Sequence, residues 1–206
     1  MLITFEGIDG CGKTTQINLL KEALSNAGHD PLLTKQPGGT ELGAKIRGLL
    51  LDRSNEAMCP QTELLLYMAD RMQHLEDVIK PALAADRLVL CDRYHDATLA
   101  YQGGGRGLDL SWLKPLESQI IAPTKTFVFQ ISPEVSKQRV LARSQSGGEA
   151  ICRLEAEEKA FFERTNQAYL ALAQAEPSRF VVIDAELPIQ EIHEMLRQEV
   201  LDLIAS

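Results

Sequence analysis

The stretch Gly7-Ile8-Asp9-Gly10-Cys11-Gly12-Lys13-Thr14 decides the fold of this chain, because it matches the phosphate-binding pattern G-x-x-x-x-G-K-[ST]. Its glycines let the backbone curl tightly, so that successive N–H groups point at phosphate oxygens. Lys13 brings a positive charge to the β- and γ-phosphates, and the Thr14 hydroxyl is placed to ligate Mg²⁺. The stretch therefore predicts a site for a nucleoside triphosphate.

The residues on either side of this loop support that prediction. Residues 2–6 form a short apolar strand before it, while Ile17, Leu20 and Leu24 recur at helical spacing after it. Gly28 then provides a typical helix end. A helix that begins at the loop turns the positive end of its dipole toward the phosphates. This context disfavours the alternative, a glycine turn that binds no ligand.

Composition limits what the rest of the chain can be. Its 206 residues, 45% of them hydrophobic, suffice for one well-packed core, so we expect a single domain over residues 1–206. The net charge is −8, from 21 Lys plus Arg against 29 Asp plus Glu, which disfavours a broad nucleic-acid surface. The four cysteines form no C-x-x-C pair, and no signal peptide or long apolar run occurs. These features predict a soluble, cytoplasmic protein that binds neither nucleic acid nor membrane.

Apolar strand candidates alternate with helical patterns along the chain. Most strand candidates are continuous apolar runs, which are typical of a parallel sheet covered on both faces. We predict strands over 2–6, 31–36, 87–92, 125–131 and 179–184, and helices over 41–51, 61–85, 110–121, 133–144, 154–175 and 188–204. The alternation predicts a doubly wound α/β fold, with a five-stranded parallel sheet between helices and ligands at the carboxyl ends of the strands.

The third predicted strand ends in an acidic residue that is followed directly by a basic one, Asp92-Arg93. An acid in this place resembles a Walker B carboxylate, which lies where Mg²⁺ would bind. Arg93 would then clamp the phosphates. A surface ion pair is the alternative, because many strands end in Asp.

The predicted helix over 61–85 carries Tyr67, Arg71 and His74 on one face, at i, i+4 and i+7. An aromatic ring and a guanidinium one turn apart can stack on a base and bind its edge. If the helix stood alone, Tyr67 as a core residue and Arg71 as a surface residue would be the favoured interpretation.

The polar segment from about 143 to 153 has the composition of a lid. It contains Gly147-Gly148 and is flanked by Arg143 and Arg153. Such a segment can close over a bound triphosphate, exclude water and bring an arginine to the transferred group. A solvated loop with incidental arginines is the alternative.

Taken together and in this order, the motifs resemble those of the bacterial thymidylate kinase family over nearly the whole chain. The Pro-Gly-Gly-Thr and Ala-Tyr-Gln-Gly blocks separate this family from adenylate, guanylate and shikimate kinases. The resemblance is carried by Phe5-Glu6-Gly7-Ile8-Asp9-Gly10, Lys13-Thr14-Thr15, Gln36-Pro37-Gly38-Gly39-Thr40, Tyr67 to Arg71, Asp92-Arg93-Tyr94, Ala100-Tyr101-Gln102-Gly103-Gly104 and Arg153-Leu154-Glu155. It implies a three-layer P-loop kinase fold with a mobile lid, and Mg²⁺-dependent transfer of the γ-phosphoryl group of ATP to dTMP, giving dTDP and ADP.

The resemblance also implies a role for individual residues. The catalytic residues would be Lys13, Arg93 and Arg153, and the metal ligands Thr14 and Asp92. ATP would be bound by Gly7, Ile8, Asp9, Gly10, Cys11, Gly12, Lys13, Thr14, Thr15 and Arg139. The residues expected to bind dTMP are Asp9, Pro37, Arg47, Tyr67, Arg71, Arg93, Thr98, Tyr101 and Gln102.

Within that set the resemblance separates several tasks. Asp9 is similar to the acid that reaches the 3′-hydroxyl of the acceptor, and Arg93 would bridge the phosphates of donor and acceptor. Tyr67 would stack on thymine and Arg71 would bind the edge of the base. Tyr101 would crowd C2′ and disfavour ribose. Related enzymes are homodimers, and the helices at 61–85 and 110–121 are candidates for the dimer surface.

The chain departs from the family pattern at three positions. Gln36 stands where relatives usually carry Glu, Ala97 stands where many carry Ser, and Cys152 replaces the usual Asp. None of these changes removes a cation of the expected catalytic set. The expected activity is therefore unchanged, and the details of the base and metal contacts are left open.

Two other classes of P-loop protein stay open at this point. A guanine-specific switch protein would show an Asn-Lys-x-Asp-like element, and none occurs here. A deoxynucleoside kinase would place a carboxylate base at a strand end, where residues 36–39 offer no acid. A nucleotide acceptor needs no such base, because a phosphate monoester with its second pKa near ~6 is already anionic at pH 7.

Overall fold

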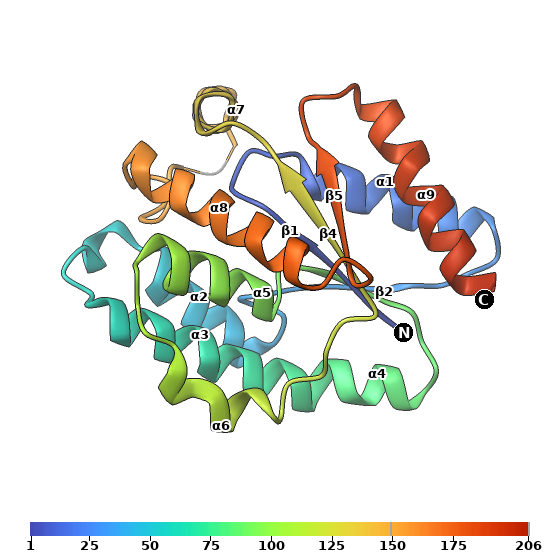
Figure 1. The fold of residues 1–206 in the computed structure, drawn as a ribbon, viewed down its shortest axis with the longest axis horizontal. Coiled ribbons are helices and arrows are strands. Elements are labelled where there is room, and N and C mark those ends of the chain that lie inside the picture. The colour runs from blue at the N-terminus through green and yellow to red at the C-terminus, as the bar shows by residue number, and fades with distance from the viewer. Residues whose placement is uncertain (149, 206) are drawn as a thin grey trace.

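Five parallel strands form the central sheet in the computed structural model, which describes residues 1–148 and 150–205 (Figure 1). They are β1 (Leu2–Glu6), β2 (Leu32–Lys35), β3 (Val89–Asp92), β4 (Lys125–Gln130) and β5 (Phe180–Asp184). Their order is β2-β3-β1-β4-β5, so β1 pairs with β3 on one side and β4 on the other. This confirms the predicted five-stranded parallel sheet, and it places the glycine loop after β1 at the middle of the carboxyl edge.

Helices cover both faces of the sheet. They are α1 (Lys13–Asn26), α2 (Glu41–Leu51), α3 (Pro60–His74), α4 (Lys80–Ala84), α5 (His95–Thr98), α6 (Lys114–Glu117), α7 (Pro133–Gln145), α8 (Lys159–Ala175) and α9 (Ile189–Ala205). Helices α1 and α9 lie together on one side of the sheet, whereas α3, α5 and α8 lie on the other (Figure 1). Among the described residues, no helix is long and apolar enough to cross a membrane.

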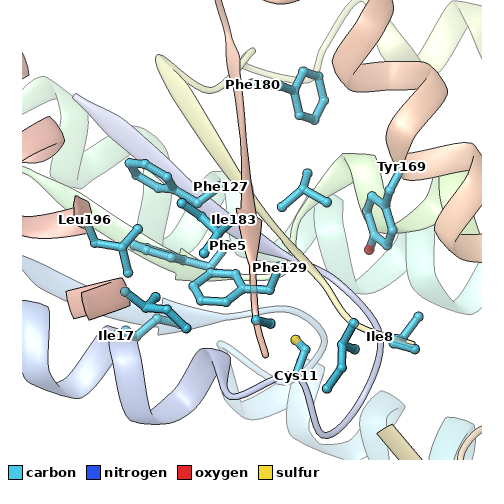
Figure 2. Close-up of a cluster of buried hydrophobic side chains, with 14 of the residues drawn as sticks. Phe5, Ile8, Cys11, Ile17, Phe127, Phe129, Tyr169, Phe180, Ile183 and Leu196 are labelled. Carbon is cyan, nitrogen blue, oxygen red and sulfur yellow. The ribbon is translucent and has the colours of Figure 1, made fainter. Parts of the chain in front are cut away.

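Aromatic and aliphatic side chains of the central strands form the core (Figure 2). The rings of Phe5 in β1 and Phe127 in β4 stack with their centroids 5.6 Å apart. Ile17 of α1 and Leu196 of α9 pack on this cluster, and both are buried. Such rings dominate core energetics because each removes a large apolar area from water. Strand β1, which leads into the phosphate loop, and its neighbour β4 are therefore fixed by the core.

The segment from 95 to 105 is helical, which the sequence did not lead us to predict. Helix α5 continues into a π-helical segment, Leu99–Gly105, that packs against α8. A Cβ on Gly104 would lie 2.5 Å from Cβ of Ala168, and one on Gly105 would lie 2.6 Å from the Phe161 ring. These glycines therefore serve a close approach of two helices rather than a flexible loop.

Three predicted helices have different limits in the structure. The helix predicted over 61–85 has a π-helical segment, Leu75–Ile79, between α3 and α4. In place of a helix over 110–121 there are only short 3₁₀ and α segments that end at Glu117, followed by i→i+3 turns. Helix α8 begins at Lys159 and not at 154, because the preceding residues form turns that close onto Cys152 and Leu154.

Candidate active site

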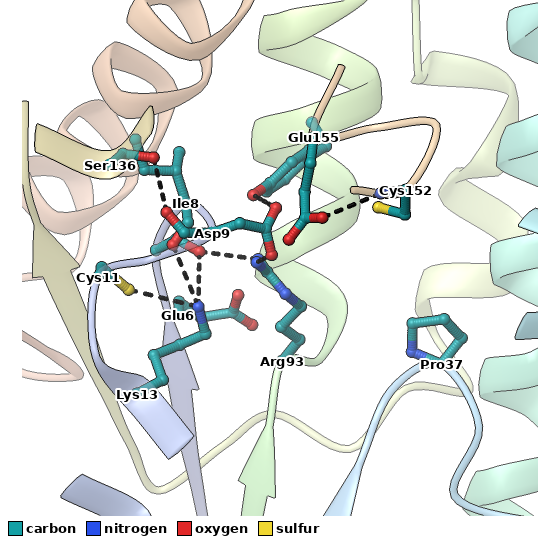
Figure 3. Close-up of polar contacts among 12 residues, drawn as sticks. Glu6, Ile8, Asp9, Cys11, Lys13, Pro37, Arg93, Ser136, Cys152 and Glu155 are labelled. Atoms are coloured by element: carbon teal, nitrogen blue, oxygen red, sulfur yellow. Dashed lines mark hydrogen bonds and ion pairs between the residues drawn. The ribbon is translucent and has the colours of Figure 1, made fainter. Parts of the chain in front are cut away.

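The phosphate loop is held in shape by its own lysine. Gly7 has a φ of 134°, and a Cβ there would lie 2.5 Å from the carbonyl oxygen of Phe129, so only glycine fits. Lys13 Nζ donates hydrogen bonds to the carbonyl oxygens of Gly7 and Ile8, at 3.0 and 3.3 Å (Figure 3). It also lies 3.3 Å from Cys11 Sγ. The ammonium group is thus fixed within the loop that it is expected to serve.

Asp9 and Arg93 form an ion pair beside the loop. Arg93 donates from Nη2 to Asp9 Oδ1 and from Nη1 to the Gly7 carbonyl oxygen, both at 2.8 Å (Figure 3). The guanidinium carbon lies 5.0 Å from the centroid of the Tyr101 ring. Burial would raise the pKa of Asp9, but the positive charges of Arg93 and Lys13 outweigh it and hold that pKa below its usual value. The pair is therefore charged at neutral pH.

Thr14 and Asp92 provide a hydroxyl and a carboxylate on the wall of one cavity. Asp92 Oδ1 is buried without a hydrogen-bond partner, so it has an acceptor oxygen to offer a cation. Mg²⁺ prefers oxygen ligands and usually takes one or two from protein, with phosphate and water completing its shell. No cluster of three or more His, Cys, Asp or Glu side chains in residues 1–148 and 150–205 could hold a metal. The site thus suits Mg²⁺ that arrives with a triphosphate.

Arg71 lines the same cavity, one helical turn after Tyr67. Its side chain is 2% exposed, and its guanidinium donates to Gln36 Oε1 at 3.0 Å, Thr98 Oγ1 at 2.7 Å and the Tyr94 carbonyl oxygen at 2.9 Å. All three acceptors are neutral. Gln36, a departure from the family's usual Glu, therefore still orients Arg71 but does not neutralise its charge.

His74 does not join the base-binding set, although it shares a helix face with Tyr67 and Arg71. Its Nδ1 lies 2.8 Å from Gln36 Nε2 and its Nε2 lies 2.6 Å from Thr34 Oγ1. Burial, together with the charge of Arg71, lowers the pKa of His74 to about 4. The ring is therefore neutral at pH 7 and connects α3 to the β2 end of the sheet.

One cavity of about 380 Å³ is lined both by the phosphate loop and by Tyr67 and Arg71. It is lined by most of the residues expected from the sequence: Asp9, Gly10, Gly12, Lys13, Thr14, Thr15, Pro37, Arg47, Tyr67, Arg71, Asp92, Arg93, Thr98, Tyr101, Gln102 and Arg139. Gly7 is absent from this lining, and the side chains of Ile8 and Cys11 are buried in the core beneath the loop. These three residues can reach a phosphate only through their backbone.

Arg153, which we expected to be catalytic, is not brought into this cavity. Its Nη2 donates to Glu63 Oε2 at 2.5 Å and its Nε donates to the Leu50 carbonyl oxygen at 3.0 Å. Its backbone N–H bonds the carbonyl oxygen of Leu51. The side chain is 7% exposed. Arg153 thus ties the end of the expected lid to α2 and α3.

Two other arginines of the lid region do line the cavity, Arg139 and Arg143. Both extend from α7, which runs through Gln145 and so includes the start of the expected lid. Arg143 donates from Nη2 to Glu155 Oε1 at 2.8 Å, and Glu155 also accepts the Cys152 N–H at 3.0 Å. Glu149, within the expected lid, lies outside the described residues.

Glu63 supports the site from behind the cavity lining, and the sequence did not lead us to expect this. It is fully buried on α3 and accepts hydrogen bonds from Gln102, Arg106 and Arg153. Burial would raise its pKa, but these donors outweigh that effect and keep it below its usual value. The available signal was its position one turn before Tyr67, on the same helix face.

A glycine loop between β1 and α1, an acid at the end of β3 and a cavity rich in cations define a P-loop phosphotransferase. The chain belongs to the thymidylate kinase family: the sequence model of that family, thymidylate kinase, matches residues 5–196. The chain is similar to the thymidylate kinase of Geotalea uraniireducens, with 44% identity over 208 residues that cover 99% of this chain and 98% of that protein.

Two further comparisons agree. The thymidylate kinase of Desulfosudis oleivorans is 48% identical over 197 residues, covering 93% of this chain and 92% of its own. A crystal structure of thymidylate kinase from Ehrlichia chaffeensis superposes with a TM-score of 0.76 at 32% identity, covering 100% of this chain and 98% of that one.

Proposed function

We propose that this chain transfers the γ-phosphoryl group of ATP to the phosphate of dTMP, giving ADP and dTDP for dTTP synthesis. One observation carries the proposal. A single cavity is lined both by the phosphate loop and by Tyr67 with Arg71, and Arg93 also lines it. A switch protein or simple ATPase needs only the phosphate loop. Tyr67 and Arg71 suit a base whose nucleotide phosphate faces the triphosphate.

The chemistry follows from this arrangement. An oxygen of the dTMP phosphate attacks the γ-phosphorus, and the bond to the β–γ bridging oxygen breaks, so that ADP leaves. The acceptor is already anionic, and catalysis then consists of positioning and of offsetting crowded negative charge. Lys13 would bind the β- and γ-phosphates, and Arg93 would lie between donor and acceptor. Asp9 would hold Arg93 and bind the sugar.

Thr14 and Asp92 would hold Mg²⁺, which would offset the negative charge of the triphosphate. The unpartnered Oδ1 of Asp92 supports this assignment.

Arg143, with Arg139, would supply the remaining positive charge from the lid side. Both line the cavity, whereas Arg153, which is paired with Glu63, does not. Closure of the lid would bring the guanidinium of Arg143 toward the transferred group and exclude water, which otherwise competes as the acceptor.

Selection of dTMP would depend on Arg71, Tyr67 and Tyr101. Arg71 would donate a charge-assisted bond to a carbonyl on the base edge, and Tyr67 would stack on the ring. The Tyr101 hydroxyl lies 3.4 Å from Asp9 Oδ2, so the ring faces the place where the sugar would lie. A ribose 2′-hydroxyl would meet that ring.

We also propose that the chain forms a homodimer through α2 and α3. These helices pack side by side, and Leu42, Leu49 and Leu65 on them are about half exposed. Several exposed leucines on neighbouring helices are typical of an interface. Leu65→Glu would then give a monomer in sedimentation equilibrium, and a monomeric parent chain would overturn the proposal.

The test of the activity is ADP formation from ATP and Mg²⁺ with dTMP, dUMP, dCMP, thymidine or water as the acceptor. We expect turnover with dTMP to exceed all the others, and Lys13→Met to abolish it while thermal unfolding stays unchanged. Equal turnover with thymidine would indicate a nucleoside kinase. Turnover that does not depend on any acceptor would indicate an ATPase.

A further inference from the structure

The backbone of Arg93 has a left-handed conformation, which residues other than glycine rarely adopt. Its φ is 64°, and among residues 1–148 and 150–205 only Asp86 shares a positive φ without being glycine. A left-handed non-glycine residue is costly, and it persists only when its surroundings fix it. The strained residue here is the one whose guanidinium reaches Asp9 and the phosphate loop.

Hydrogen bonds to strand β1 hold this turn in place. The Arg93 N–H donates to the Phe5 carbonyl oxygen at 2.9 Å, which continues the β1–β3 ladder by one residue. The next N–H, of Tyr94, donates to Glu6 Oε1 at 2.7 Å. Two successive backbone donors are thus tied to β1, and the second needs a side-chain carboxyl because the ladder has ended.

Helix α8 completes the support through Tyr169. Its hydroxyl donates to the other carboxyl oxygen, Glu6 Oε2, at 2.7 Å. Its ring also meets the edge of Tyr101, with centroids 6.4 Å apart, and Tyr101 lies under the Arg93 guanidinium. Glu6 and Tyr169 are both fully buried, and neither lines the cavity. In the view of Figure 3 the Glu6 side chain appears between those of Lys13 and Arg93.

We infer that Glu6, together with Tyr169, is a positioning residue that holds Arg93 in its strained backbone conformation and so aims its guanidinium at the phosphates. The inference rests on the proposed role of Arg93. Glu6 does not touch the substrates and acts through Arg93 alone.

The free-energy cost of burying the Glu6 carboxyl argues against a purely structural role for this residue. Burial, and then the negative charge of Asp96, raise the pKa of this carboxyl to about 7. A buried acid that resists ionisation costs stability, and an apolar residue would pack in this core at lower cost. Its two hydrogen bonds lead to the Arg93 turn and to the helix behind Tyr101, and nowhere else.

The test is a double-mutant cycle on kcat, with Glu6→Gln, Arg93→Ala and the double variant. Glu6→Gln keeps the volume and one acceptor oxygen, and a misplaced catalytic group of this kind costs about 10- to 100-fold in rate. We expect that loss in kcat with little change in KM for ATP. In the Arg93→Ala background the same change should have an effect within about twofold, because its target is gone.

Two further variants make the cycle decisive. Tyr169→Phe removes one hydroxyl and should repeat the pattern with a smaller loss, which keeps the test available if Glu6→Gln folds poorly. Thr4→Val is the matched control, because Thr4 is buried in the same strand and its hydroxyl contacts Thr126, 2.8 Å away, rather than the Arg93 turn. It should leave kcat unchanged.

Each outcome has one meaning. Non-additive losses for Glu6→Gln or Tyr169→Phe with Arg93→Ala support the inference. Full losses that persist in the Arg93→Ala background overturn it, while the proposed role of Arg93 survives if that variant alone loses turnover. Near-normal turnover of Arg93→Ala overturns the proposed role of Arg93, and the inference with it.

Discussion

Arg71 combines two properties that seldom occur together, because it is almost fully buried and yet has only neutral hydrogen-bond acceptors. Its positive charge is therefore available to a ligand in the cavity. Hydrogen bonds to charged groups contribute about 1.5–3 kcal/mol each. Arg71→Leu should accordingly raise KM for dTMP by about 10- to 100-fold and leave KM for ATP nearly unchanged. Tyr67→Ala should act in the same direction through lost stacking, and equal losses for both substrates would point to a damaged helix instead.

Two arginines of the lid region are candidates for the catalytic role, and the structure places them in different surroundings. Arg143 lines the cavity, and Arg153 is buried against Glu63 and Leu50. Removing an arginine that offsets transition-state charge costs about 10³-fold or more in turnover. We expect that loss in Arg143→Ala. Arg153→Ala should instead lower the melting temperature and raise KM for dTMP, because Glu63 also holds Gln102.

Steady-state kinetics of both variants, with thermal unfolding measured beside them, decide between these roles. A collapsed kcat in Arg153→Ala with normal turnover in Arg143→Ala would return the catalytic role to Arg153. Normal turnover in both would remove the lid arginines from the mechanism.

At the scale of elements, the sequence predicted what depends on local pattern and missed what depends on packing partners. All five strands and the phosphate loop follow from apolar runs and glycine spacing. The helix through Gly104 and Gly105 does not, because these glycines allow a close approach to α8, which lies far away in the chain. The ion pair of Arg153 could not be read from sequence for the same reason, since its partner Glu63 is 90 residues away.

Across the whole molecule, the buried histidines and the buried Glu6 change the stability of the fold with pH in opposite directions. His74 and His95 have pKa values lowered by burial to about 4 and about 3, so folding resists their protonation. Their contribution is present above the usual pKa of 6.5 and is lost as pH falls toward the lowered values. Glu6 acts in the other direction. Its pKa is raised to about 7, so its contribution is present below 4.5 and is lost as pH rises through 7.

This opposition gives a prediction for Glu6→Gln. Between pH 4.5 and 7 the folded parent chain retains a proton on Glu6 that the unfolded chain has released, which offsets part of the destabilisation by the histidines. The variant lacks this proton, so its free energy of unfolding should fall more steeply toward acid. As pH rises from 4.5 to 7, the free energy of unfolding of the variant should increase relative to that of the parent by up to about 3 kcal/mol. Above pH 7 the difference should stay constant. Urea unfolding from pH 4.5 to 8 would measure the difference, with Thr4→Val as a control that should run parallel to the parent. Parallel curves for Glu6→Gln as well would mean that Glu6 ionises in the folded chain as it does in water, and the burial that raises its pKa would then not be the dominant influence on it.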